Sequence, residues 1–263
     1  MDAFVGIDLA FAKRKRLPVA LCVWESGVLQ PRYAALAGAP EPPRGAGNVA
    51  ALDPECVAGF AEDVVTYLRR LEEHFALAIR RVAIDAPSAP REEHVARRRA
   101  ETALDAKGIS CIPTPSAAQF GAIRERVLRH LQSGGDESHL PHANQLWMLA
   151  GFALFERLRR EWECLEVFPQ ATAAVLGANL IHKSKPGGVA AQLQAAARHT
   201  GWPQAPAEEA LIGVAFGHPH DCLDAYLSAW VAALPIDKRE PLGAPPNDVI
   251  WVPALDVEVG AET

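Results

Sequence analysis

The sequence predicts a mixed α/β fold in which helices cover both faces of a central sheet. Three observations support this fold class. Short apolar segments joined by tight turns open the chain, which is typical of an antiparallel meander. Later apolar segments are short and do not alternate with polar residues, as in strands that are buried on both faces. Between these later segments apolar residues recur with a helical period, which gives the strand and helix order of an α/β sheet.

The meander is expected at residues 3–7, 17–24 and 28–33. A Pro/Gly-rich segment at residues 37–48 should form a loop. The next element is a helix over residues 54–78, because apolar side chains recur there at helical spacing. Asp53 and Pro54 suit the N-cap and the first helical position. The first helical layer therefore follows the meander directly.

The alternating part of the chain begins with the buried strand "RVAIDAP" at residues 81–87, predicted to lie parallel to the first strand. Helices are expected at residues 91–107, 116–131, 142–162, 189–198 and 221–234, and a further strand, "CLEVF", at 164–168. A short helix and a basic Gly loop at 182–188 follow that strand. The tail "NDVIWVP" is expected to add an edge segment. We interpret residues 1–263 as one domain with a helical insertion around 116–162.

The predicted helix at 142–162 is more apolar than one buried stripe requires. One face should pack on the sheet. The other could be covered by neighbouring helices or by a second subunit, so a homodimer is one interpretation and intramolecular packing the favoured one.

Composition excludes some function classes. A net charge of −6 argues against a broadly basic nucleic-acid coat, although a local basic patch could still bind phosphate. The five cysteines are scattered, without a C-x-x-C pair, which favours reduced thiols over a zinc site or disulfides. The sequence has no secretory signal pattern and no apolar run near the roughly 20 residues of a membrane span. These features predict a cytoplasmic protein without a membrane partner.

Acidic residues lie at strand ends and at a late helix start. Asp8 ends "FVGI" and Asp85 ends "RVAI". If these strands are parallel neighbours, their carboxyl ends lie side by side, where open α/β sheets bind ligands, and the two acids face each other. Glu166 lies within "CLEVF". Asp221 and Asp224 share one face of the first turn of the late helix.

Carboxylates held close together repel one another, and a divalent cation with a preference for oxygen ligands relieves that repulsion. The pattern therefore predicts a Mg²⁺ or Mn²⁺ site. Paired metals about 3.5 to 4 Å apart can activate water and stabilise a leaving oxygen, which suits phosphodiester hydrolysis.

The order "FVGIDLA", "VAIDAPS", "LEVFPQA", a Lys/Gly loop, "HDCLDAYLSAW" and "VIWVP" resembles a family of predicted ribonuclease-H-like nucleases, domain of unknown function 429. The resemblance covers nearly the whole chain. It implies a five-stranded sheet of order 3-2-1-4-5 with metal-binding acids on strand one, strand four and a late helix. On this sequence these are Asp8, Asp85 and either Asp221 or Asp224, with Asp224 the better match and Glu166 an accessory acid on strand five.

Each residue also has a simpler interpretation. Asp8 and Asp85 could accept hydrogen bonds from backbone amides in turns. Glu166 could be solvated or, if it faces inward, paired with a partner. For Asp221 a helix-capping role is favoured, and Asp224 could complement the helix dipole.

Four basic residues are candidates for binding a substrate backbone: Lys13, Arg14, Lys183 and Lys185. Lys13 and Arg14 could instead be a solvent-exposed hairpin tip. Lys183 and Lys185 precede a helix in a Gly-containing loop, but their spacing is not that of a Walker A motif.

The leading hypothesis is a metal-dependent nuclease in which Asp8, Asp85 and Asp224 hold Mg²⁺ or Mn²⁺, Glu166 assists, and nucleic acid is the substrate. One alternative is a non-catalytic module on the same fold that binds nucleic acid or protein. A second is a phosphotransferase of the actin and sugar-kinase type. That class usually needs two domains and Gly-rich phosphate loops, so we rank it lower.

Overall fold

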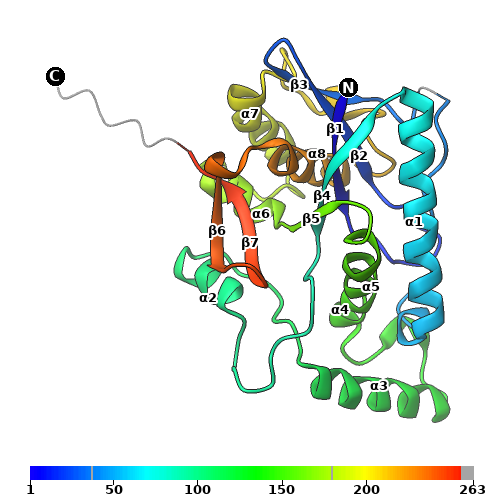
Figure 1. Ribbon diagram of the computed structural model, residues 1–263. Helices are drawn as coiled ribbons and strands as arrows, with labels where there is room; N and C mark the ends of the chain where they lie inside the picture. The colour runs from blue at the N-terminus through cyan, green and yellow to red at the C-terminus, as the bar shows by residue number, and fades with distance from the viewer. Residues whose placement is uncertain (37, 179, 256–263) are drawn as a thin grey trace.

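A five-stranded sheet organises the chain, and the computed structural model describes residues 1–36, 38–178 and 180–255 (Figure 1). The strands lie in the order β3-β2-β1-β4-β5. Their bounds are β1 Asp2–Asp8, β2 Val19–Glu25, β3 Val28–Arg32, β4 Ala78–Asp85 and β5 Glu163–Glu166. The first three strands pair antiparallel, whereas β4 pairs parallel with both β1 and β5. The predicted fold class and strand order are confirmed.

Helices cover both faces of this sheet, as predicted (Figure 1). Alternation along β1 separates the faces: Ala3, Val5 and Ile7 join the core under α1 (Pro54–Phe75) and α5 (Met148–Leu158). Phe4 packs instead against the core of α7 (Gly188–Thr200) and α8 (Pro219–Ala233). Because successive side chains of a strand point to opposite faces, Asp8 lies on the α8 side.

Asp53 accepts a hydrogen bond from the Glu55 amide and Pro54 opens α1, as the sequence indicates. The helix ends at Phe75, because Ala76 adopts a left-handed conformation. The helical period of the sequence predicts an end at residue 78, three residues later than the observed end.

The predicted helix at residues 91–107 was too long, because α2 begins only at Arg99 (α2 Arg99–Ala106). Asp248, from the far end of the chain, accepts hydrogen bonds from the backbone amides of Arg99 and Ala100 and so fixes the helix start. Arg98, just before the start, is extended and turns inward.

The predicted helix at 142–162 is two helices, α4 (Ala143–Leu146) and α5. The Trp147 indole N–H donates 2.8 Å to the Asn144 carbonyl oxygen, the group that an uninterrupted helix would pair with the amide of residue 148. Apolar residues on both sides of the break, among them Leu146 and Leu154, pack inside the chain, as the intramolecular interpretation requires.

The tail forms more than an edge segment. β7 (Asp248–Pro253) pairs antiparallel with β6 (Arg239–Ala244), a strand that the sequence pattern did not indicate, and the two make a separate sheet. A bridge between Val167 and Trp251 ties this hairpin to the chain that leaves β5. β6 contains Pro241 and Gly243, which weaken a strand pattern.

The remaining elements are α3 (Ala117–Gln132), α6 (Pro169–Val175) and four 3₁₀ turns, at Ala50–Leu52, Glu137–His139, Glu208–Leu211 and Ile236–Lys238. The five cysteines are all described and all free. Within the described residues no helix is both long and apolar enough to cross a membrane. Residue 37 of the predicted loop and residues 256–263 of the predicted domain lie outside the described residues.

Candidate metal centre

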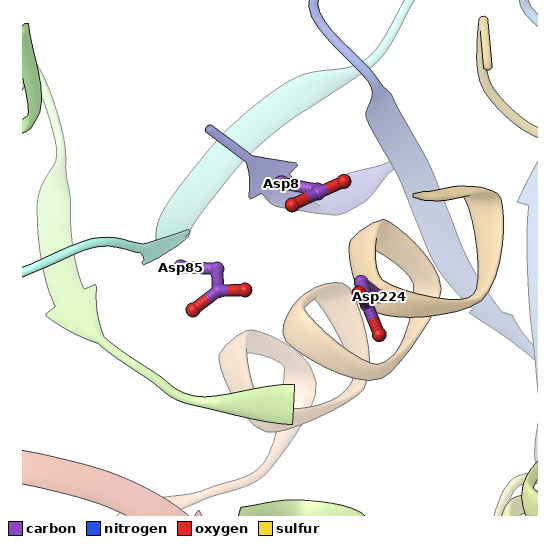
Figure 2. A group of neighbouring side chains, drawn as sticks. All are labelled: Asp8, Asp85 and Asp224. Carbon is purple, nitrogen blue, oxygen red and sulfur yellow. The ribbon is translucent and has the colours of Figure 1, made fainter. Parts of the chain in front are cut away.

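Three carboxylates from distant parts of the chain meet at the end of the sheet. Asp8 and Asp85 are register partners at the ends of the parallel strands β1 and β4, so their side chains leave the same face. Asp224, on α8, completes the group, and one oxygen from each side chain lies within 4.8 Å of the others. Figure 2 shows the three carboxylates turned toward a common space.

Close approach of α8 to β1 makes this convergence possible. A Cβ at Gly6 would overlap the Ala225 carbonyl oxygen and the Ala229 amide nitrogen. Only glycine therefore allows the helix backbone to lie directly on the strand here. Gly6 is two residues from Asp8, and Ala225 adjoins Asp224, so the same contact sets the separation of the two acids.

Electrostatics disfavour three ionised carboxylates at this position. Burial, followed by repulsion from Asp224, raises the pKa of Asp8 well above its usual range. The same two causes raise the pKa of Asp85 to about 8. Burial also raises the pKa of Asp224, although Lys183 opposes that effect. These acids need a compensating cation when they are ionised.

Lys183 supplies part of that compensation through a direct ion pair with Asp224 Oδ2. Burial opposes the charge of the lysine, but the Asp224 carboxylate holds the pKa of Lys183 above its ordinary value. Three negative charges facing one positive charge leave a deficit that a divalent cation would balance. Asp224 Oδ1 is buried and accepts no hydrogen bond, so one oxygen of the group is without a partner.

The donor set fits a hard divalent cation, since all three groups offer carboxylate oxygens. Magnesium binds such oxygens at about 2.0 to 2.1 Å, so opposite ligands lie about 4.2 Å apart. The three oxygens, all within 4.8 Å of one another, are grouped on the scale of one coordination sphere.

Asp221 lies beside the group but is occupied by other partners. Its Oδ2 accepts from the His218 amide in a capping box at the start of α8, and its Oδ1 lies 2.9 Å from Lys15 Nζ. Although burial acts in the opposite direction, the bond to Lys15 holds the pKa of Asp221 below its usual range. Asp221 therefore helps to cap α8, but from the third helical position, because the N-cap itself is His218.

Glu166 is buried and paired. It is the register partner of Ile84, so it leaves the opposite face of the sheet from Asp85. Arg98 binds both of its oxygens, at 2.7 and 2.9 Å, and the Ser88 amide adds a third bond of 2.8 Å. The inward alternative for Glu166 is therefore correct, and its partner is Arg98.

A cavity of about 630 Å³ opens onto Asp8 and Asp224. Three lysines line it, at positions 13, 15 and 183, together with His220. Arg14 and Lys185 are exposed and do not line this cavity, so the structure separates the four predicted substrate-binding residues into two pairs.

The sequence does not single out two further residues of this region, Lys15 and Arg98. Lys15 belongs to the basic run that follows Asp8, and Arg98 to a run of three arginines. A run of basic residues does not show which side chain turns inward, because that depends on partners that are distant in the sequence. Lys15 and Asp221 are 206 residues apart.

A protein family described as a protein of unknown function, DUF429, matches residues 6–248 of the chain. The match begins in β1 and ends at the start of β7, so it includes all three carboxylates. None of the curated proteins and none of the solved structures matches the chain.

Proposed function

The chain belongs to this family of proteins of unknown function, and on that premise we propose that it is a divalent-metal-dependent phosphodiesterase of the nuclease type. The observation that carries the proposal is the convergence of Asp8, Asp85 and Asp224 at the carboxyl ends of two parallel strands. Such a position is where open α/β sheets bind their ligands.

Asp8, Asp85 and Asp224 would hold Mg²⁺ or Mn²⁺ through carboxylate oxygens. The cation, when bound, supplies Lewis-acid activation of water and charge stabilisation at the phosphate. The buried Asp224 Oδ1, which has no hydrogen-bond donor, supports this assignment. Asp221 is the weaker of the predicted ligands, because Lys15 and the cap of α8 already use both of its oxygens.

The lysines of the cavity would bind the substrate backbone. Lys183 neutralises Asp224 through a direct ion pair. An ammonium has three N–H donors, so Lys183 would also donate to a phosphate oxygen of the substrate. Lys13 lines the same cavity and would contact a neighbouring phosphate. Arg14 and Lys185, which are exposed, would reach only a longer polyanion.

Glu166 would assist from a distance, as a positioning residue. Its two oxygens are bound by Arg98 and the Ser88 amide, so it holds the segment after β4 in place. The same contacts leave it no free oxygen to direct at a substrate.

A cytoplasmic location and a homodimer stay predictions for this activity. The free, scattered cysteines suit a reducing compartment.

A cleavage assay tests the proposal. Wild type should hydrolyse at least one of four substrates (single-stranded, duplex, hybrid or branched nucleic acid) with Mg²⁺ or Mn²⁺, and a chelator should abolish the activity. Asp85→Asn should reduce the rate by at least about a hundredfold, the scale of losing one charged transition-state contact. Asp63→Asn, an exposed position on α1, is the matched control and should retain full activity.

Activity that survives both Asp85→Asn and chelation would eliminate the mechanism. If calorimetry detects no divalent cation binding at all, the non-catalytic binding module becomes the better interpretation.

A further inference from the structure

A cavity of about 340 Å³ is lined by α3, by α4 and by the segments that precede α2 and α3. We propose that it is a phosphate-binding site, separate from the carboxylate group. The inference does not rest on the proposed function, because phosphate binding here needs neither a metal nor cleavage of a substrate.

Charge in this cavity is of one sign. Arg91 and Arg126 line it, and among the described residues no acidic side chain does. Every hydrogen-bond partner that the described chain offers to these two guanidinium groups is neutral. Glu93, an exposed neighbour, accepts from the Ala118 amide and does not line the cavity. The cavity therefore attracts anions.

Arg91 places one of the two charges in the interior, since the residue is only 9% exposed. Its Nη1 donates to the backbone carbonyl oxygens of Glu92 and Val95, and its Nη2 donates 2.8 Å to Gln119 Oε1. A buried arginine is normally paired with an opposite charge. An anion in the cavity would supply that charge.

Gln119, an exposed residue of the lining, is held with its amino group free. Its Oε1 accepts from Arg91 Nη2 and, at 3.0 Å, from the Ser116 amide. Both partners can only donate, so they fix the orientation of the side-chain amide. No described residue accepts a hydrogen bond from its NH₂ group. Gln119 therefore brings N–H donors to the cavity.

A chain of hydrogen bonds holds Arg126 at the cavity. A guanidinium can only donate, so His142 Nε2 accepts from Arg126 Nη1, at 2.9 Å. His142 Nδ1 then carries the ring proton and donates to Gln145 Oε1, at 3.3 Å. Gln145 Nε2 in turn donates 3.1 Å to the Pro113 carbonyl oxygen. His142 uses one of the five N–H donors of Arg126, and no other described residue accepts from the rest.

Free donors beside two fixed positive charges match a phosphate group. Arginine binds phosphate oxygens through charge-assisted hydrogen bonds in a planar fork. Arg126 and Gln119 would donate to these oxygens, and Arg91 would balance the charge from the buried side. Gln119 lies in the first turn of α3, where the helix dipole also favours an anion.

The phosphate could belong to a polynucleotide or to a small phosphorylated molecule. Pro113 and Thr114 also line a cavity of about 480 Å³ that reaches Asp85. A nucleic-acid backbone that extends from the carboxylate group along these residues would reach the site. A small molecule would need only the site itself.

Calorimetric titration of the full chain with inorganic phosphate, in metal-free buffer, tests the inference. Wild type should bind phosphate, and Arg126→Gln should lower the affinity by at least about tenfold, the scale of one hydrogen bond to a charged group. Arg129→Gln, an exposed position on α3 outside the lining, is the matched control and should bind as wild type does. No binding by wild type, or equal affinities for wild type and Arg126→Gln, would overturn the inference. An equal loss in Arg129→Gln would do the same.

Gln119→Glu tests the donors without disturbing the fold. The carboxylate still accepts from Arg91 and from the Ser116 amide, and a glutamate suits this position of the capping box. The variant has no NH₂ group and pairs Arg91 internally. It should melt no lower than wild type and lose at least about tenfold in phosphate affinity. Wild-type affinity in a folded Gln119→Glu protein would contradict the proposal.

Fluorescence anisotropy with a single-stranded oligonucleotide, over a range of salt concentrations, separates the two sources of phosphate. If a polynucleotide backbone occupies the site, Arg126→Gln should weaken binding and reduce the slope of log affinity against log salt by about 0.7, the value of one phosphate contact. If a small phosphorylated molecule does, the oligonucleotide should bind wild type and Arg126→Gln equally. Either result supports a phosphate site once the titration with inorganic phosphate has shown one.

Discussion

Cation binding and burial favour opposite ionisation states of the acids in the carboxylate group. Asp85 must be ionised to bind a cation, yet burial and the nearby Asp224 raise its pKa to about 8. The metal-free protein therefore holds a proton there at pH values where an unfolded chain, with an ordinary aspartate pKa near about 3.9, has released it. Stability and metal affinity should consequently respond to pH in opposite directions.

Between about pH 4 and pH 8 the folded protein binds more protons at Asp85 than the unfolded chain, so the free energy of unfolding falls as pH rises. Asp85→Asn removes this contribution. In the presence of a chelator the variant should melt close to wild type at about pH 4 and at a higher temperature at about pH 8. Thermal unfolding followed by circular dichroism at the two pH values provides the measurement.

Mn²⁺ at about pH 8 should raise the melting temperature of wild type and not that of Asp85→Asn, because only a ligand that binds the folded state stabilises it. Asp63→Asn should follow wild type under every condition. If the difference in melting temperature between wild type and Asp85→Asn does not vary with pH, the raised pKa of Asp85 is not the cause of that difference.

Contacts between secondary-structure elements determine how far apart the acidic side chains of the site lie. The contact of α8 with β1 at Gly6 is the clearest case, since a Cβ there would overlap the helix backbone. Gly6→Ala should lower the free energy of unfolding by about 1 to 3 kcal/mol through overpacking. It should also weaken Mn²⁺ binding, because Asp224 moves away with the helix.

Gly59→Ala is the control for that substitution. Gly59 lies in α1, where an added Cβ would meet no neighbouring element within 4 Å, so alanine should stabilise the helix by about 0.5 to 1 kcal/mol. Urea unfolding and calorimetry measure both effects. A Gly6→Ala protein with wild-type stability and affinity would show that the close approach is not needed.

The start of α2 depends on a second contact between elements, in which the residue before the helix meets β5 and β7. Arg98 is buried against Glu166 of β5 and also contacts Asp248 of β7. Arg98→Met leaves the Glu166 carboxylate buried without its charged partner, which should cost about 3 to 5 kcal/mol in urea unfolding. Arg99→Met, at the exposed neighbour, should change stability by less than about 0.5 kcal/mol. Equal effects at the two positions would contradict this role for Arg98.

Across the whole molecule, local patterns predicted the sheet well. The meander and the non-alternating strand before Asp85 are visible in short windows of sequence, and parallel pairing of β1 with β4 brings Asp8 opposite Asp85. The strand order itself came from the resemblance to a family. Strand position therefore predicted two of the three acids that meet, and the resemblance to a family singled out the third, Asp224, over Asp221 on α8.

Long-range partners could not be predicted in the same way. The start of α2 is fixed by Asp248, 150 residues after Arg98, and the pairing of Glu166 with Arg98 joins β5 to the residue before α2. A helical period contains no information about such partners. The break at Trp147 likewise depends on one side-chain hydrogen bond, which periodicity does not reveal.

Binding of one divalent cation by Asp8, Asp85 and Asp224 together is the central claim. Anomalous diffraction from crystals soaked in Mn²⁺ tests it most directly. We expect a peak within about 2.0 to 2.3 Å of oxygens from all three side chains, at the space shown in Figure 2. A soaked crystal without a peak there, or with manganese bound only elsewhere on the protein, would contradict the claim.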